Sequence, residues 1–187
     1  RLEAALKAAR HAVELDPADA YAQAALGDAL GQQGRFPQAE AAFDRALELN
    51  PGSADILTFY SGWAMSFGKA QAGASAADQA RRLNPSYPPW AALGYFAFAY
   101  FNVGRYRDTV DVLVPLPPES RSLDDLVLEA GSLAMLDRPA EAQAAVERAL
   151  AQDPGLTIGS VVSNPGYSEA ERERLVQTMR KAGFPAE

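Results

Sequence analysis

The side chains that most often carry out catalysis or bind metals are scarce in this sequence. The chain of 187 residues has no cysteine and a single histidine, His11. The lack of cysteine excludes a thiol nucleophile, a disulfide framework and a cysteine-ligated zinc site. Asp108 and Asp111 lie three residues apart, but no histidine or third carboxylate of matching spacing accompanies them. We therefore expect no catalytic residue, no metal and no cofactor, and predict that the protein is not an enzyme.

The charge balance argues against nucleic acids and membranes as partners. The chain carries 24 acidic and 17 basic residues, a formal net charge of -7. Binding to a phosphate backbone needs clustered positive charge, which this composition does not favour. With 48% hydrophobic residues the chain is expected to fold, and no apolar run is long enough to cross a bilayer. No charged and then apolar leader opens the sequence, so we expect a cytoplasmic protein.

The sequence contains an internal repeat, and this repeat must position any residues that bind a partner. Its turn dipeptides are Asp16-Pro17, Asn50-Pro51, Asn84-Pro85 and Asp153-Pro154. The first three are spaced by 34 residues, and the fourth follows two periods later with one extra residue. Alanine stands five residues before each proline, at Ala12, Ala46, Ala80 and Ala149. Small residues in a fixed register indicate close helix contacts, so the period extends beyond the turns.

Each repeat has the signals of a helical hairpin. In residues 20–49, Leu26 and Leu30 recur four apart, which predicts one apolar helix face. Gly34 is expected to end the first helix, because glycine tolerates the left-handed cap geometry. Asn50-Pro51 ends the second, since the residue before proline is pushed out of the helical region. Such a hairpin cannot bury its apolar face alone and must stack on neighbours.

These features resemble the tetratricopeptide repeat, a 34-residue helix-turn-helix unit with small residues at the closest helix contacts. The resemblance implies an all-α fold, a right-handed α-solenoid of antiparallel helix pairs with a C-terminal capping helix. We predict an array over residues 1–154 and a connecting segment with a capping helix over residues 155–187. Within the array we expect a half repeat at 1–17 and repeats at 18–51, 52–85, 86–121 and 122–154.

The ends and one internal segment depart from the regular repeat. Residues 2–15 match only a second helix, and the chain begins without methionine, so we interpret it as a fragment of a longer protein. The alternative is a natural half repeat that solvates the array. Prolines at 115, 117 and 118 predict that residues 115–122 are its weakest segment. Ser168 and Glu171 predict a capping box, and Gly183 the end, of the final helix.

The resemblance also implies a site. In tetratricopeptide arrays the first helices of the repeats line a concave groove, where extended peptides or helices bind. On this register the groove residues are Tyr21, Asp28, Asp55, Phe59, Tyr95, Phe98, Phe101, Leu128 and Met135. Family members that bind a C-terminal carboxylate use lysine, arginine and asparagine here. This groove has essentially none, so that mode of binding is disfavoured.

The helix that contains Tyr95, Phe98 and Phe101 also has Phe96 and Tyr100, and its rings occupy more than one face. A helix that is apolar all round is normally buried all round. Its cover is expected to be an external peptide, a second copy of the chain, or the chain's own residues 155–167. Alternatively, the rings only pack between neighbouring helices and leave an ordinary exposed patch.

The closing stretch, residues 153–185, is more particular than a generic cap. It resembles the ends of bacterial proteins that carry tetratricopeptide repeats behind a class III adenylate/guanylate cyclase domain or a winged-helix regulator domain. Two hypotheses follow. The chain is a non-catalytic module that binds a partner protein segment in its groove. Alternatively, it is a regulatory or dimerising arm of such a protein, with the groove filled by its own C-terminal segment.

Overall fold

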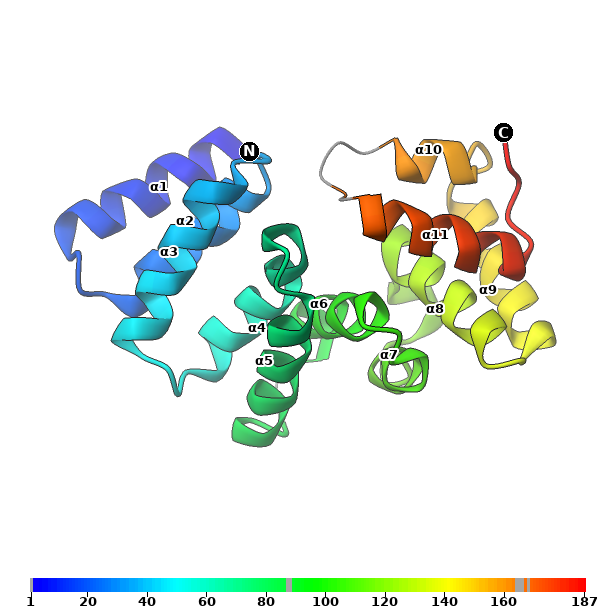
Figure 1. The fold of residues 1–187 in the computed structure, drawn as a ribbon, viewed down its shortest axis with the longest axis horizontal. Coiled ribbons are helices and arrows are strands. Elements are labelled where there is room, and N and C mark those ends of the chain that lie inside the picture. The colour runs from blue at the N-terminus through cyan, green and yellow to red at the C-terminus, as the bar shows by residue number, and fades with distance from the viewer. Residues whose placement is uncertain (1, 87–88, 164–166, 168) are drawn as a thin grey trace. The chain divides into compact units, whose positions relative to one another are not determined.

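A computed structural model describes residues 2–86, 89–163, 167 and 169–187. Residues 164–166 and Ser168, the predicted cap of the final helix, lie outside the described residues. All regular elements in the described residues are helices, and none of them is a strand (Figure 1). The chain divides into two compact units, Arg1–Tyr87 and Pro88–Glu187. The boundary falls between residues 87 and 88, and each unit is described by itself.

Unit 1, residues Arg1–Tyr87, is built from helical hairpins. Its elements are α1 (Leu2–Leu15), α2 (Ala20–Gly31), α3 (Phe36–Leu49), α4 (Ala54–Trp63), the 3-10 turn η1 (Ala64–Phe67) and α5 (Ala70–Leu83). The side chain of Asp19 caps α2 and that of Ser53 caps α4, each accepting bonds from first-turn N–H groups. Helix α2 packs against α1, α3 and α4, and α4 packs against α5.

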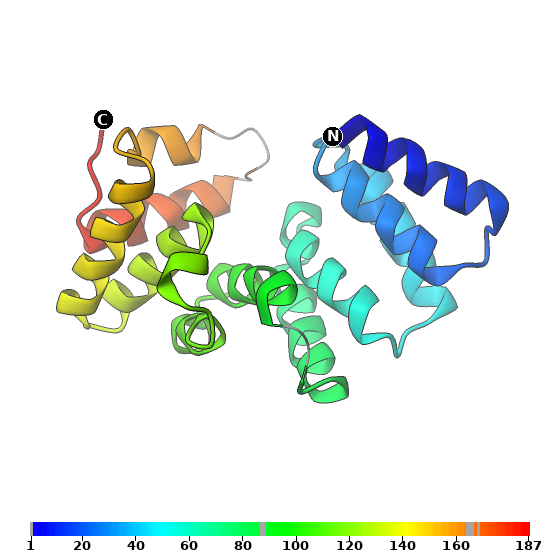
Figure 2. The same cartoon turned by 180° about the vertical axis from the view of Figure 1, so that it is seen from behind.

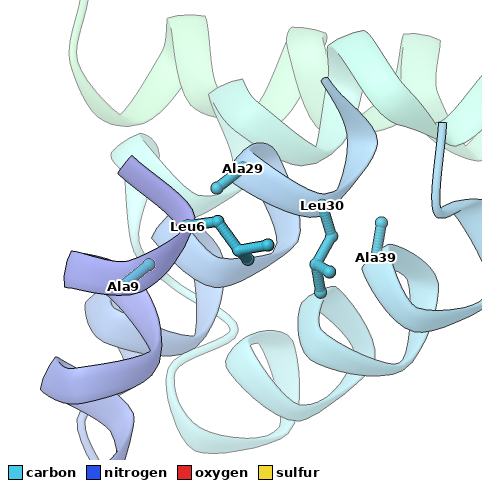
Figure 3. Packing of buried hydrophobic residues seen from close by; sticks show 5 residues of the cluster. All are labelled: Leu6, Ala9, Ala29, Leu30 and Ala39. Carbon is cyan, nitrogen blue, oxygen red and sulfur yellow. The ribbon is translucent and has the colours of Figure 1, made fainter. Parts of the chain in front are cut away.

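One core cluster of unit 1 is built from small and branched apolar residues. Leu6 and Ala9 from α1 meet Ala29 and Leu30 from α2 and Ala39 from α3 (Figure 3). Of the alanines predicted at close helix contacts in this unit, Ala46 and Ala80 are buried, whereas Ala12 is half-buried. The turn signals are also confirmed, because Gly34 has a φ of 71°.

Unit 2, residues Pro88–Glu187, contains two hairpins and a C-terminal cover. Its elements are α6 (Pro89–Asn102), α7 (Tyr106–Leu113), the 3-10 turn η2 (Pro118–Ser120), α8 (Leu123–Met135), α9 (Pro139–Gln152), α10 (Ile158–Val162) and α11 (Glu169–Ala182). Helix α11 packs along α8 and also touches α9 and α10. Figure 1 and Figure 2 show this arrangement from opposite sides. Residue 137, where other repeats have glycine, is an aspartate with a φ of 56°.

Several contacts anchor the proline-rich segment 115–122, and its place as the weakest part of the array stays a prediction. Leu116 is buried, and its carbonyl accepts a bond of 3.1 Å from Arg121 Nη2. The guanidinium of Arg121 also forms a buried ion pair with Glu129 on α8. Arg148 on α9 lies 3.5 Å from the other oxygen of that carboxylate. The sequence pattern missed this anchor because its partners come from three elements.

No described helix is both long and apolar enough to cross a bilayer.

Candidate partner-binding surface

The predicted groove residues divide into four in unit 1 and five in unit 2. In unit 1 they lie on α2 and α4, which contact each other. We call Tyr21, Asp28, Asp55, Phe59 and Trp63 the α2–α4 face. The five in unit 2 are Tyr95, Phe98, Phe101, Leu128 and Met135, on α6 and α8. The two sets differ in their exposure.

An aromatic pair marks the α2–α4 face. The rings of Tyr21 and Phe59 meet edge to face, with centroids 6.2 Å apart and planes at 62°. Tyr21 is 53% exposed, whereas Phe59 is half-buried. Such a pair stabilises its own geometry and still presents apolar ring surface to solvent. A partner segment can therefore reach Tyr21 without any rearrangement of the helices.

Trp63 fixes the neighbouring part of this face. Its indole Nε1 donates a hydrogen bond of 2.8 Å to Asp28 Oδ1, which joins α4 to α2. The other carboxylate oxygen of Asp28 accepts a bond of 2.7 Å from Gln32. A Cβ added to Gly31 would lie 2.7 Å from the indole ring, so only glycine lets Trp63 pack this closely. Asp28 therefore has a structural role as well as a place on the surface.

Asp55 lies in the first turn of α4, where a negative charge favours the helix dipole. It is half-buried. The α2–α4 face thus combines two carboxylates with three aromatic rings. Sequence reasoning included four of its residues and missed Trp63 and the underlying Gly31. The available signal was the glycine spacing of four, Gly27 and Gly31, on a helix that faces large aromatic residues.

In unit 2, Phe101 and Leu128 are buried, at 0% and 4% exposure. Both side chains therefore belong to the core of unit 2; the sequence alone had left open whether this part of the groove is accessible or covered by the chain itself. Helix α11 packs on α8, where a Cβ added to Gly131 would lie 2.9 Å from the Cβ of Thr178. Leu175 and Met179 of α11 are buried in the same packing.

The remaining residues of unit 2 are partly covered by the chain itself. Tyr95, Phe98 and Met135 are half-buried. The ring of Phe98 stacks on Tyr167, with centroids 6.4 Å apart and planes at 28°. Burial raises the pKa of Tyr167 to about 12, and the carboxylates of Asp124 and Glu171 contribute to the rise. Tyr167 belongs to the segment 155–167 that was one of the predicted covers of this helix.

Among the described residues, no three histidine, cysteine, aspartate or glutamate side chains are grouped so that they could hold a metal ion. His11 lies on the exposed side of α1, with Nδ1 3.5 Å from Glu14 Oε2. Asp108 forms an ion pair of 2.8 Å with Arg105. These contacts give His11 and Asp108 ordinary surface roles.

One hairpin of unit 1 matches a known family of repeats. Residues 20–53 match the tetratricopeptide repeat family model. No curated protein matches the sequence. The matched repeat contains α2 and α3, and the remaining hairpins follow the same architecture.

Several solved structures share the fold. PilW, a type IV pilus biogenesis factor, aligns with a TM-score of 0.66 at 16% identity, over 96% of this chain and 85% of its own. YrrB, described as a TPR protein with an unusual peptide-binding site, gives 0.57 at 19% identity, over 82% and 79%. PilF of Pseudomonas aeruginosa gives 0.58 at 20% identity, over 89% and 76%.

At these identities the likeness establishes the fold alone. The predicted fold class, an all-α solenoid of the tetratricopeptide type, is confirmed. The resemblance of residues 153–185 to cyclase or winged-helix fusion proteins finds no support in these comparisons.

Proposed function

We propose that this chain is a protein-interaction scaffold that binds a partner segment on the α2–α4 face of unit 1. The observation that carries the proposal is the exposed Tyr21–Phe59 pair, which stands beside the interhelical anchor of Trp63 and Asp28. Rigid aromatic residues that are already positioned bind partners with little loss of conformational entropy. The tetratricopeptide match at 20–53, which contains α2, supports an interaction role.

The chemistry of the face indicates the kind of segment that it accepts. An apolar side chain would pack on Tyr21 and Phe59. Asp55 and Asp28 give the face a negative charge, so a lysine or arginine beside that apolar side chain fits best. The corresponding helices of unit 2 offer less surface, because Phe101 and Leu128 are buried. We therefore assign partner binding to unit 1.

A peptide-display selection against the full chain tests this proposal. Peptides enriched in an apolar residue next to a base are expected, and Tyr21→Ala should weaken their binding by about tenfold or more. Leu83→Ala is the matched control, since Leu83 is 51% exposed on α5 of the same unit and lies outside the face. Equal losses for the two variants, or selected peptides that ignore Tyr21→Ala, would contradict the assignment.

A second candidate is the regulatory or dimerising arm whose groove is filled internally. The stack of Phe98 on Tyr167 and the packing of α11 on α8 favour it for unit 2. Light scattering over a range of concentrations tests dimerisation. A mass that stays that of one chain while selected peptides bind would favour the scaffold.

A further inference from the structure

The four hairpins share a basic residue directly after the left-handed turn residue. These bases are Arg35, Lys69, Arg105 and Arg138. Three of them pair with carboxylates, at 2.8 Å for Lys69 with Glu40, 2.8 Å for Arg105 with Asp108 and 2.6 Å for Arg138 with Glu141. In the part of the chain that the structure describes, Arg35 has no such ion pair. Its Nε donates instead to the neutral Oε1 of Gln38, at 2.6 Å.

The repeat register shows what replaces the missing carboxylate. Lys69 reaches back to Glu40 at 2.8 Å and to Asp44 at 3.6 Å on the preceding second helix, α3. One repeat of 34 residues earlier, the positions of Glu40 and Asp44 are occupied by Leu6 and Arg10 on α1. The contact of Lys69 with α3 therefore has one cation and two carboxylates. The corresponding positions of Arg35 and α1 have two cations, Arg35 and Arg10, and no carboxylate.

Arg10 and Arg35 line a common hollow between α1, α2 and α3. Its volume is about 390 Å³, and its other lining residues are Gln23, Leu26, Leu30, Gln38, Ala41 and Ala42. The hollow therefore combines two guanidinium groups and two amides with an apolar wall, and its lining contains no carboxylate. An adjoining hollow of about 600 Å³ shares both arginines, but Glu3 and Glu14 give it a mixed charge.

The smaller hollow is electrically unusual in a chain with a net charge of -7. Arg10 has no ion pair with any of the residues that the structure describes. No acidic residue stands in the first turn of α3, so the positive end of its dipole adds to the two guanidinium groups. Two like charges at one site repel each other unless an anion lies between them.

We propose that this hollow binds an acidic segment of a partner protein. One aspartate or glutamate carboxylate of that segment lies between Arg10 and Arg35, and an adjacent apolar side chain packs against Leu26 and Ala42. Guanidinium groups recognise carboxylates through paired, charge-assisted hydrogen bonds. The site is distinct from the α2–α4 face, because Leu30 projects from the side of α2 opposite to Tyr21, at about 100° per residue. The two proposals therefore stand or fall separately.

The test uses the full chain and a labelled pentapeptide of alternating acidic residues and leucines, titrated by fluorescence anisotropy. The matched peptide has the corresponding amides in place of the acids. The acidic peptide is expected to bind at least about tenfold more tightly than the amide peptide. Arg35→Gln and Arg10→Asp should each lower its affinity by about tenfold or more. Arg45→Gln, at an exposed arginine of α3 that pairs with Glu48, should leave it unchanged.

Arg10→Asp separates loss of binding from loss of folding. It recreates the arrangement of Asp44 and Lys69, so the variant should melt no lower than the parent chain while it loses the acidic peptide. Binding that neither Arg35→Gln nor Arg10→Asp affects would overturn the proposal, as would equal binding of the amide peptide or no binding at millimolar concentration. Competition by sulfate at the peptide's own concentration would show a simple anion site instead. A dimer that Arg10→Asp dissociates would identify a second copy as the occupant.

Discussion

The α2–α4 face of unit 1 and helices α6 and α8 of unit 2 follow the same repeat pattern, but they differ in what covers them. Tyr21 is 53% exposed and pairs with Phe59, whereas Phe101 and Leu128 are buried. In unit 2 the chain supplies its own cover, through Tyr167 and α11. A repeat register therefore specifies which side chains are presented, and the rest of the chain decides whether they stay accessible.

Removal of residues 155–187 is expected to have the largest effect, because it uncovers α8 and the ring of Phe98. Unit 2 should lose its cooperative unfolding transition, and binding of a hydrophobic dye should rise. The loss of helical signal in circular dichroism should exceed the loss expected from the removed helices α10 and α11 alone. Removal of Glu187 alone is the control. A truncated chain that melts like the parent and binds no dye would show that unit 2 does not need its cover.

Replacing one aromatic side chain with alanine in each unit compares the two regions directly. Phe101→Ala should destabilise the protein by about 3–5 kcal/mol, because it opens a cavity in a buried core. Tyr21→Ala should cost less than about 1 kcal/mol, since most of that ring already faces solvent. Urea unfolding followed by circular dichroism measures both. Similar losses in the free energy of unfolding for the two variants would contradict the difference in burial.

Two glycines of unit 1 differ in how closely other atoms approach them, and they give a test with a smaller expected effect. Gly31→Ala would place a Cβ 2.7 Å from the indole of Trp63. Overpacking costs about 1–3 kcal/mol, and alanine's better helix propensity offsets up to about 1 kcal/mol of that. We expect a net loss of stability and a shift in Trp63 fluorescence. Gly52→Ala, where only a distant Asn50 oxygen lies nearby, should be close to neutral.

The smallest effect concerns pH and is confined to unit 2. The folded state keeps Tyr167 protonated up to a pKa of about 12, against 10.0 for an ordinary tyrosine. Its contribution to stability is therefore complete below pH 10 and is lost as the pH rises toward 12, because only the unfolded chain ionises there. Tyrosinate absorbance should show a residue titrating near pH 12 that Tyr167→Phe removes, while Tyr60, whose pKa burial also raises, still titrates late in the variant. If Tyr167→Phe leaves the titration near pH 12 in place, another tyrosine is responsible.

Much of the fold was predictable because its signals are local. The proline turns and Gly34 ended helices where expected, and Ala46, Ala80 and Ala149 lie buried between helices as the register required. Residues 2–15 form a single helix, as their match to a second helix predicted. These features depend on backbone geometry and side-chain size within one hairpin, which a repeat makes visible.

The candidate site was less predictable because its decisive contacts join distant segments. Trp63 and Asp28 are 35 residues apart, and Arg174 donates to the hydroxyl of Tyr106 from 68 residues away. Both separations are close to one or two repeat periods, but the repeat register predicts only which helices are neighbours and not which side chains bond across them. The anchor of Arg121 on Glu129 joins residues only eight apart, and it was missed because its partners come from three elements.

The sequence by itself determined the helices, their turns and the positions at which helices come close, since each follows from the period, from residue size and from backbone preference. Only the tertiary structure decided which aromatic residues are exposed and which charges are paired. Burial and ion pairing depend on the three-dimensional neighbours of a side chain. For Phe98 that neighbour is Tyr167, from a segment far along the chain, and for Arg35 the register supplies a second arginine in place of a carboxylate.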